Sequence, residues 1–447
     1  MRCIHLPRRV ARFISAANRS AHQARWFSSI ILLACLLFAG NIAHAGSWPV
    51  ISAIDFSGNE VTQPVTMMRE LSIRVGGPAD PQLIERSRQA IQDLGLFRAV
   101  EVSITPSGDG VRVRFTVHEK WRILPVPRVD GNSGGEYGYG GQLRWNNVWG
   151  LNHTLNIQAM SRTYREPGRS GEQSIQAGYS VPFIGDSRFG LSGSAGVASQ
   201  DSLDDQGRPY HESIDTAQIL GSYALSREHP SKGWNVSAGL SWVRDAPSGQ
   251  YAPGPISIGT GPIVSVAYDD LKYLIYSEEG QRFRGTLQWG LDGVASTYSA
   301  SSLSLSYRRD WLVGETPHQN IEWLAAASEY MGGAPGRQHS FFTLGGSRSL
   351  RGYSSGFLEG DAGYYLGAAY LRPVGRDWAR LLVILEAGSA YPDPGHLQGR
   401  PILASIGLGV RIRINWLINT EIEIGAALPL VDSHGIRPFL GSVSQNR

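Results

Sequence analysis

The nine-residue stretch 345–353 carries the most distinctive chemistry in the sequence. It contains Gly345 and Gly346, followed by Arg351, Gly352 and Tyr353. A glycine beside an arginine lets the backbone bend sharply, so a guanidinium and an aromatic ring can dock on the same surface. A guanidinium that is partly removed from water needs a carboxylate partner. In a soluble protein this stretch would be an exposed loop, so its role depends on the surrounding fold.

Glu386 is the candidate partner for Arg351. It interrupts an apolar run, and Gly388 follows two residues later. If Leu385 and Ala387 face one side of a strand, Glu386 faces the other side. We expect an ion pair between Arg351 and Glu386 that locks the loop in place. Its contribution is roughly 1–3 kcal/mol, because desolvation offsets part of the attraction.

Four further charges share one face of a predicted hairpin. Arg411 and Arg413 precede a turn, and Glu421 and Glu423 follow it. The hairpin pairs Arg413 with Glu421 and Arg411 with Glu423, and opposite charges on neighbouring strands stabilise a sheet. Contact with lipid would be costly for these groups. We therefore expect a charge ladder inside a lumen, which fits a solvated structural role as well as a role in transport.

No residue pattern predicts catalysis or a bound cofactor. The residues around Ser347 lack the spacing of a nucleophile elbow, and the glycine pairs at 138–141 and 407–409 do not match a dinucleotide loop. The 11 histidines are scattered without metal-ligand spacing. Both cysteines, Cys3 and Cys35, lie in a segment that we expect to be removed, which excludes disulfides from the mature chain. We expect no enzyme, no metal site and no cofactor.

Residues 1–45 have the three parts of a secretory signal peptide. Six arginines and no acidic residue precede or flank an apolar core at 30–38, and the cleavage signal ends at Ala45. A lipoprotein site at Cys35 is disfavoured because cleavage there would cut the apolar core in half. The chain has 41 Lys and Arg and 38 Asp and Glu; removing those 6 arginines leaves 35 against 38, a balance of −3. This balance gives no support to nucleic-acid binding.

From about residue 136 onward, apolar and small polar residues alternate. We place about fifteen strands by this period of two. After the signal peptide there is no apolar run long enough for a membrane helix. The polar face is rich in Ser, Gly, Asn and Gln, where a soluble β-sandwich would carry more Lys and Glu. Tyr and Trp recur near strand ends, as in the girdles of membrane barrels. The pattern favours an all-β transmembrane barrel over 136–447.

Residues 46–120 follow a different pattern. A strand at 50–56 precedes a short helix at 65–71, and a second helix begins after Asp80 with Pro81 in its first turn. Strands at 97–104 and 111–117 complete a small α+β domain. The Pro- and Gly-rich segment 121–135 predicts a linker to the barrel.

Together these features resemble the BamA/TamA-type superfamily of outer-membrane assembly and translocation proteins, in which periplasmic POTRA domains precede a barrel of about sixteen strands. Residues 54–59, which end in Gly58 and Asn59, resemble the opening strand and turn of a POTRA domain. The stretch 345–353 resembles the family's lumenal loop motif. Residues 386–388 resemble its acidic-x-Gly partner motif, with Glu386 where the family usually has Asp. Residues 268–282, 406–411 and 427–430 resemble other barrel strands.

The resemblance implies a Gram-negative outer-membrane protein with one POTRA domain in the periplasm. The implied function is assembly, insertion or translocation of unfolded outer-membrane or secreted polypeptides, by strand addition at the POTRA edge and the barrel seam. Membrane lipid and periplasmic accessory proteins are the other implied partners. We expect a first strand near Tyr137 and a weak last strand containing Gly441. The end of the chain, 442–447, lacks the aromatic residue typical of such barrels.

Three alternatives to the assembly function remain. The chain could form a passive channel, act as a structural barrel, or be a two-partner secretion transporter. The last is disfavoured because such transporters usually have two POTRA domains.

Overall fold

The computed structural model describes residues 48–131, 137–163, 171–204, 206–226, 229–333, 341–347, 349–354, 356–393, 400–418, 420–431 and 435–443. The predicted signal peptide, 1–45, and Arg348 lie outside these residues. The chain divides into Met1–Pro49 and Val50–Arg447.

The N-terminal part of this unit is a small α+β domain. It contains strand β1 (Ile51–Ser57), helices α2 (Pro64–Met68) and α3 (Pro81–Asp93), and strands β2 (Phe97–Ser107) and β3 (Gly110–Glu119). The sheet order is β1-β3-β2, with β1 parallel and β2 antiparallel to the central strand. Helix α3 begins as the sequence predicts, because the Asp80 side chain accepts a hydrogen bond of 2.8 Å from the Gln82 amide.

A dry apolar core holds the small domain together. The fully buried side chains come from both faces that meet in this core, the sheet and the helices: Ile51, Met67, Ile91, Phe97, Val113 and Phe115. Gly58 ends β1 with a φ of +78°, and a Cβ there would collide with the Val117 carbonyl oxygen. The Asn59 side chain donates a hydrogen bond of 3.0 Å to the Thr62 carbonyl and closes the same turn.

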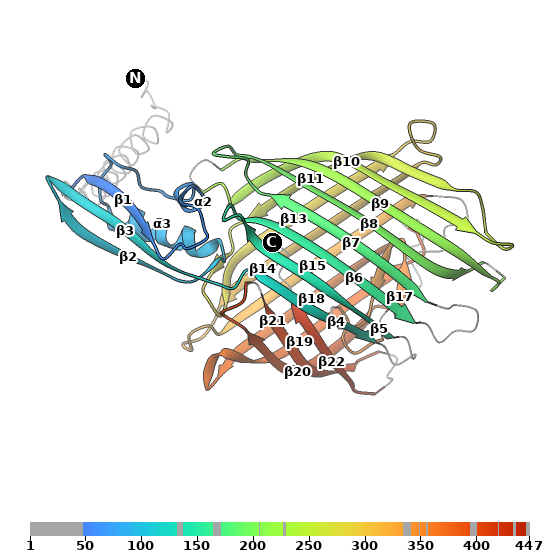
Figure 1. Cartoon of the computed structure of the whole chain (residues 1–447). Coiled ribbons are helices and arrows are strands. Elements are labelled where there is room, and N and C mark those ends of the chain that lie inside the picture. The colour runs from blue at the N-terminus through green and yellow to red at the C-terminus, as the bar shows by residue number, and fades with distance from the viewer. Residues whose placement is uncertain are drawn as a thin grey trace, which may run out of the picture. The chain divides into compact units, whose positions relative to one another are not determined.

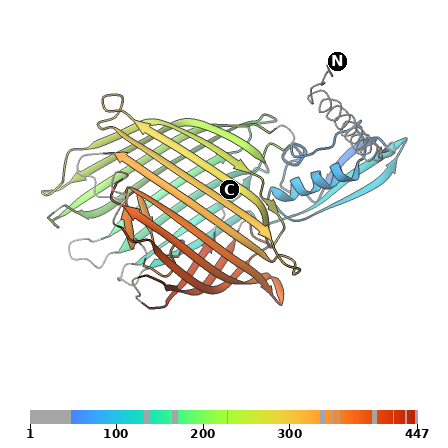
Figure 2. The same cartoon turned by 180° about the vertical axis from the view of Figure 1, so that it is seen from behind.

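The rest of the described chain forms a closed barrel of sixteen long strands, which confirms the predicted fold class (Figures 1 and 2). Strands pair antiparallel from β4 through to β22, and β22 lies beside β4 to close the barrel. The strands are β4 (Ile123–Gly131), β5 (Tyr137–Val148), β6 (His153–Thr163), β7 (Glu172–Val181), β8 (Phe189–Leu203), β9 (Pro209–Ala224), β10 (Gly233–Ser248), β11 (Ser257–Asp269), β13 (Glu278–Gly290), β14 (Ala300–Leu312), β15 (Asn320–Gly332), β18 (Ala362–Val374), β19 (Arg376–Tyr391), β20 (Leu403–Arg413), β21 (Glu421–Pro429) and β22 (Arg437–Val443). The short β12 (Lys272–Tyr273) lies in a turn, and β16 (Phe342–Leu344) pairs with β17 (Leu358–Gly360) within one long loop.

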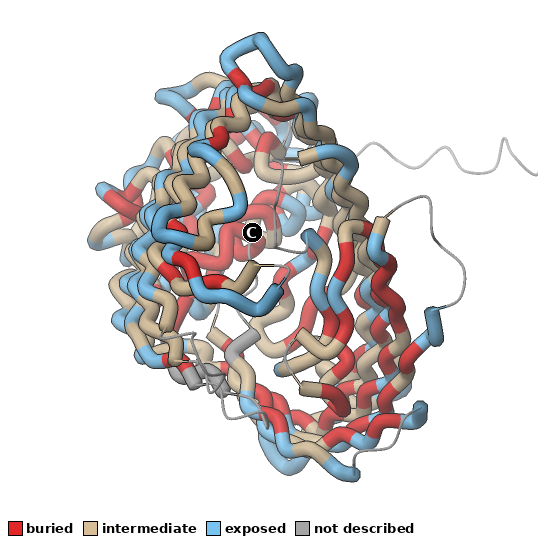
Figure 3. The backbone as a smooth tube through the Cα atoms, turned by 90° about the vertical axis from the view of Figure 1, so that its right-hand side faces the viewer, coloured by how far each residue is buried: buried red, intermediate tan, exposed pale blue. Residues whose placement is uncertain are grey.

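The barrel buries polar groups and exposes apolar ones. On β20, Leu408 is 58% exposed, whereas Arg411, which points to the opposite face of the same strand, is 4% exposed. Along the strands in Figure 3, buried, intermediate and exposed residues follow one another closely. Because successive side chains point to opposite faces, the apolar residues of β20 face outward and its two arginines face the lumen. Among the described residues, no helix has the length and apolar content needed to cross a membrane.

The predicted linker is wrong for residues 123–131, which form β4, the first strand of the barrel. The expected first strand near Tyr137 is β5, the second strand. Pro125 and Pro127 caused the error, because proline in a short polar segment usually marks a linker. Proline is also tolerated in a strand where its missing N–H is not needed by a neighbour.

Candidate functional site

The long loop between β15 and β18 folds back against the inner wall of the barrel. Its strands β16 and β17 pair with Phe342 opposite Gly360 and Leu344 opposite Leu358. Leu344, Leu350, Tyr353 and Leu358 then form an apolar cluster with the wall residues Tyr365, Ala390 and Leu403. This cluster seats the tip of the loop, the segment 345–353 singled out from the sequence.

The backbone at the loop tip lies very close to the wall. A Cβ atom on Gly352 would lie 2.7 Å from the Pro429 nitrogen and 3.0 Å from the Leu428 carbonyl carbon, so only glycine fits. The Tyr353 hydroxyl lies 3.0 Å from the Ala404 carbonyl oxygen and 2.6 Å from that of Val431. Gly352 and Tyr353 therefore dock the tip on strands β20 and β21. Gly345 and Gly346 form the turn opposite, where the Gly346 amide donates to the Tyr353 carbonyl at 3.1 Å.

Arg351 connects the loop to three barrel strands. Its Nη2 lies 3.1 Å from Glu423 Oε2 on β21, and its Nε lies 3.8 Å from Glu386 Oε1 on β19. Its guanidinium carbon lies 5.3 Å from the centre of the Phe439 ring on β22. The predicted pair with Glu386 is therefore the longer of two ion pairs, and the sequence did not predict the shorter one with Glu423.

Glu386 is held mainly by hydrogen bonds rather than by the arginine side chain. Its Oε2 accepts from the Arg351 backbone amide at 2.7 Å and from Ser405 Oγ at 3.0 Å, and its Oε1 accepts from the Tyr365 hydroxyl at 2.8 Å. The carboxylate is 2% exposed. Gly388, the other half of the predicted partner motif, lies opposite Tyr365 in the strand register. Glu386 thus fixes the backbone of the loop tip as well as its charge.

The predicted charge ladder lies on one wall of the lumen. Arg411 is opposite Glu423 and Arg413 is opposite Glu421 in the register of β20 and β21. Arg411 Nη2 lies 2.6 Å from Glu423 Oε1, and Arg413 Nε pairs with Glu421 Oε1. All four residues are at most 5% exposed. Each is therefore a buried charge that depends on its partner.

The ladder is larger than the sequence predicts. Glu322 on β15 accepts two bonds from Arg411 at 2.6 and 2.7 Å and also faces Arg308 on β14. Arg308 lies 2.8 Å from Asp310 and 3.0 Å from Glu278, and the fully buried Arg380 lies 3.6 Å from Glu421. Two of the missed pairs, Arg411 with Glu322 and Arg380 with Glu421, join strands that are not neighbours in the chain. Arg308 was missed although its partners lie on its own strand and on the strands directly before and after it. Their place on the inward face of each strand was the only available signal.

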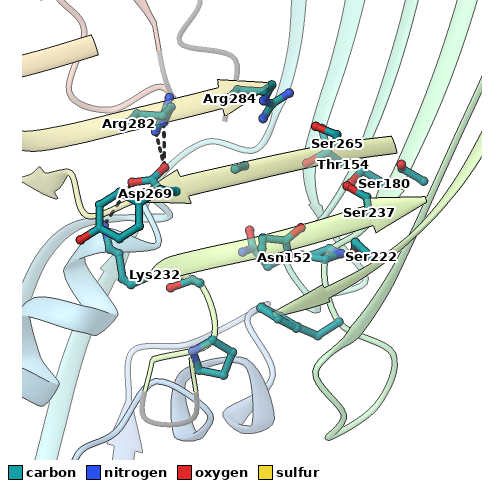
Figure 4. A pocket seen from close by; sticks show the side chains of 18 of the residues that line it. Asn152, Thr154, Ser180, Ser222, Lys232, Ser237, Ser265, Asp269, Arg282 and Arg284 are labelled. Atoms are coloured by element: carbon teal, nitrogen blue, oxygen red, sulfur yellow. Dashed lines mark hydrogen bonds and ion pairs between the residues drawn. The ribbon is translucent and has the colours of Figure 1, made fainter. Parts of the chain in front are cut away.

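Two cavities occupy the lumen of the described barrel. The first, of about 820 Å³, has Arg351, Arg411 and Glu423 on one side and the amide side chains of Gln142, Asn156 and Gln218 on the other. The second, of about 610 Å³, includes Gln218 and is lined by many small polar residues together with apolar side chains and a few charged ones. Figure 4 shows Thr154, Ser180, Ser237 and Ser265 gathered in this second cavity, with Arg282 bonded to Asp269. The wall from β5 to β11 is therefore polar but mostly uncharged.

The small domain contacts the turns at one end of the barrel. The Thr66 hydroxyl donates to the Gly150 carbonyl at 2.8 Å, and Ser231 Oγ donates to Glu70 Oε2 at 2.9 Å. Lys120 Nζ donates to the Tyr273 hydroxyl at 2.7 Å. Glu70 is 1% exposed, and its burial raises the pKa of this carboxyl to about 7 despite the hydrogen bonds from Ser231. This end of the barrel is hence the end that shares a compartment with the small domain.

The lumenal residues form a network of ion pairs and hydrogen bonds that holds the loop against the wall. In the part of the chain that the structure describes, no group of three or more His, Cys, Asp or Glu side chains is arranged to hold a metal ion.

Two family models match different parts of the chain. The family model described as surface antigen variable number repeat, POTRA, matches residues 49–120. The model for the haemolysin secretion/activation protein ShlB/FhaC/HecB matches residues 130–246. The outer membrane protein assembly factor BamA of Nitratidesulfovibrio vulgaris is 38% identical over 73 residues, which is 16% of this chain and 9% of that protein. The chain thus covers only a small part of that relative.

Solved structures show the same fold at low identity. BamA from Haemophilus ducreyi lacking POTRA domains 1–3 has a TM-score of 0.52 at 15% identity, covering 88% of this chain and 84% of that one. CdiB from Acinetobacter baumannii has a TM-score of 0.58 at 15% identity, covering 89% and 73%. CdiB from Escherichia coli has a TM-score of 0.57 at 17% identity, covering 89% and 75%.

A periplasmic POTRA domain and a sixteen-stranded outer-membrane barrel with an inward-folded loop therefore occur in one chain. In both of its parts the chain is similar to proteins of the BamA/TamA type, in which a POTRA domain precedes an outer-membrane barrel.

Proposed function

We propose that this protein inserts or translocates unfolded polypeptides at the outer membrane, using the barrel seam between β4 and β22 as the site where a client strand pairs. The POTRA sheet supplies a first pairing edge along β2, which lies at the edge of its sheet. Membrane lipid surrounds the barrel, and periplasmic accessory proteins would act on the POTRA side.

The observation that carries this proposal is the placement of two prolines at the seam. The Asn146 amide donates to the Arg122 carbonyl at 2.8 Å, and these residues lie directly opposite each other when the register of β4 and β5 is extended. In an antiparallel pair, alternate residues direct their N–H and C=O groups to opposite neighbours. Residues 124, 126 and 128 therefore bond to β5, so Pro125 and Pro127 face β22.

Two missing donors weaken the seam at its first strand. A proline nitrogen carries no hydrogen, so β4 cannot donate to β22 at either position. The partner strand β22 has only 7 residues and contains Gly441, which further lowers its contribution to pairing. Arg351 contacts β19, β21 and β22, so the loop tip rests on the strands beside this seam. Loop locking by Arg351, Glu386 and Glu423 would then regulate how easily the seam opens.

A liposome assay tests the proposal. The full chain is reconstituted, and the folding of an unfolded outer-membrane protein into the same vesicles is timed by its heat-modifiable gel mobility. We expect faster folding than in empty vesicles. The double variant Pro125→Ala and Pro127→Ala should slow it, while Pro262→Ala on β11 should not. If the unmodified chain did not accelerate folding, the proposed insertion function would be ruled out.

Secretion through the lumen is the second candidate function. It is favoured by the match to the haemolysin secretion family and by the uncharged polar wall from β5 to β11. In this case a client would cross the vesicle membrane and become accessible to protease on the far side, without insertion. A large steady conductance with neither activity would instead indicate a passive channel.

A further inference from the structure

Three side chains near the far end of the β8–β9 hairpin form a hydrogen-bonded chain. Asp201 on β8 lies directly opposite His211 on β9, and its Oδ1 is 3.0 Å from His211 Nδ1. His211 Nε2 is 3.2 Å from Ser199 Oγ. A carboxylate can only accept, so Nδ1 carries the hydrogen, and Nε2 is left to accept the serine proton. This is the order of nucleophile, base and orienting acid used for acyl transfer on several unrelated folds.

The three residues lie on the outer face of the barrel. On β8 the outward positions run from Phe189 through Leu191 to Val197, which are 58%, 42% and 53% exposed. This apolar stretch extends roughly 26 Å along the strand, and a strand tilt of about 40° reduces this length to about 20 Å of height, somewhat less than the lipid-facing band of about 25 Å. Ser199 is the next outward residue, at the end of the barrel away from the small domain. Ser199 therefore lies near the outer end of the lipid-facing band, where the outward residues of β8 change from apolar to polar at Ser199 and Asp201.

An apolar groove leads to the serine. A cavity of about 550 Å³ on this face is lined by Ser199 together with Tyr139, Gly141, Ala159, Ile175 and Val197. Small residues on β5 and β6 make room between larger ones on β7 and β8. The groove points into the lipid band, and its surface suits an acyl chain rather than a polar ligand.

The neighbouring strands supply hydrogen-bond donors for a developing oxyanion. Gln173 on β7 lies opposite Ser199 in the register, and Ser213 on β9 lies opposite it on the other side. Both side chains project from the same outward face as Ser199. A glutamine amide or a serine hydroxyl can stabilise the negative oxygen of a tetrahedral intermediate.

We propose that Ser199, His211 and Asp201 form a hydrolytic site for the acyl esters of outer-leaflet lipids. Ser199 Oγ attacks the ester carbonyl carbon while His211 Nε2 takes its proton. The carbon–oxygen bond to the lipid alcohol breaks, and His211 returns the proton to the leaving oxygen. Water then adds to the acyl-serine with His211 as base, releasing the fatty acid and restoring Ser199. Asp201 is a positioning residue that holds the histidine ring.

The test uses the full chain folded in detergent and in phospholipid vesicles. A long-chain alkyl fluorophosphonate should label Ser199, as located by mass spectrometry of the modified peptide. Release of fatty acid from the vesicles should fall at least about 100-fold in Ser199→Ala and in His211→Gln. Ser301→Ala is the matched control, because Ser301 follows the outward alternation of β14, and it should keep full activity. Heat-modifiable gel mobility verifies folding of each variant.

Two further variants separate catalysis from structure. Asp201→Asn should lower kcat with KM unchanged, and Asp201→Glu should restore part of the loss. Absence of label on Ser199, or equal fatty-acid release by folded Ser199→Ala, overturns the proposal. Hydrolysis of short soluble esters without release from vesicles overturns the assignment to lipid.

Discussion

Phe115 in the small domain and Arg411 in the barrel are both buried, but their surroundings are opposite. Phe115 packs among apolar side chains from a sheet and two helices. Arg411 lies between Glu322 and Glu423 on a wall whose other face is apolar. The small domain is stabilised by removing hydrocarbon from water. The barrel keeps hydrocarbon outside against lipid, so its interior must be held by charges and hydrogen bonds that satisfy one another.

From this contrast we expect the largest loss of barrel stability when a charged side chain is removed from the lumen. Replacing Arg411 by Ala leaves Glu322 and Glu423 without their closest partner, and breaking a buried ion pair costs about 3–5 kcal/mol. We expect the barrel to unfold at a lower urea concentration, as followed by gel mobility without boiling. The control is Arg376→Ala, because Arg376 is exposed at the start of β19. An unchanged midpoint for Arg411→Ala would mean that the ladder is solvated rather than buried.

Removing a buried apolar side chain from the small domain should lower the stability of that domain alone. Ile91 on α3 is fully buried. Replacing it by Ala leaves a cavity and costs about 2–5 kcal/mol. Protease cleavage within 50–120 should increase, while the barrel keeps its heat-modifiable mobility. If the barrel lost stability by the same amount, the two regions would not be energetically separate.

The small domain also contains a buried ionisable side chain, Glu70. Its pKa is about 7 in the folded chain, against an ordinary value of 4.5. The folded state therefore holds this proton more tightly, and the stabilisation present at low pH is lost as the pH rises through 7. The slope is about 1.4 kcal/mol per pH unit, or roughly 3 kcal/mol in total.

Protease cleavage of the small domain in urea measures this dependence. We expect more cleavage at pH 8 than at pH 5.5 in the unmodified chain, after correction for protease activity. Glu70→Gln should remove most of the difference, while Glu85→Gln on the exposed side of α3 should leave it intact. A pH difference that persists in Glu70→Gln would assign it to other groups.

Arg351 should have a smaller effect than Arg411, because it is partly exposed at 12% and its pair with Glu386 is long, at 3.8 Å. Replacing it by Ala should cost roughly 1–3 kcal/mol and should free the loop before the barrel unfolds. Limited proteolysis of 341–357 measures release of the loop. Unchanged protection in Arg351→Ala would show that the apolar cluster around Tyr353 locks the loop without the arginine.

At the seam we expect a change in stability of about the same size as for Arg351, but of opposite sign. Pro125→Ala and Pro127→Ala together restore two backbone donors toward β22, each contributing about 0.5–1.5 kcal/mol. The barrel should therefore become more heat-stable. The same double variant should slow insertion of a client if the seam opens during function. Lower heat stability would show that the prolines relieve strain in β4.

The sequence by itself determined the class of each region and the local charge pairs. Alternation with a period of two indicated strands with one apolar face, and helix signals at Asp80 and Pro81 indicated the small domain. The pairing of Arg411 with Glu423 was predictable because the two strands are joined by a short turn, which fixes their register locally.

Only the tertiary structure decided which distant strands meet. Barrel closure made 123–131 a strand, because the N–H groups that Pro125 and Pro127 lack would point toward β22, so the pairing of β4 with β5 is complete. It brought Glu322 to Arg411 and gave Arg351 its closer partner, Glu423. It also determined which face of β8 and β9 turns outward, and so placed Ser199, Asp201 and His211 together at the lipid boundary. These contacts depend on strand number, register and curvature of the whole barrel, which no short stretch of sequence encodes.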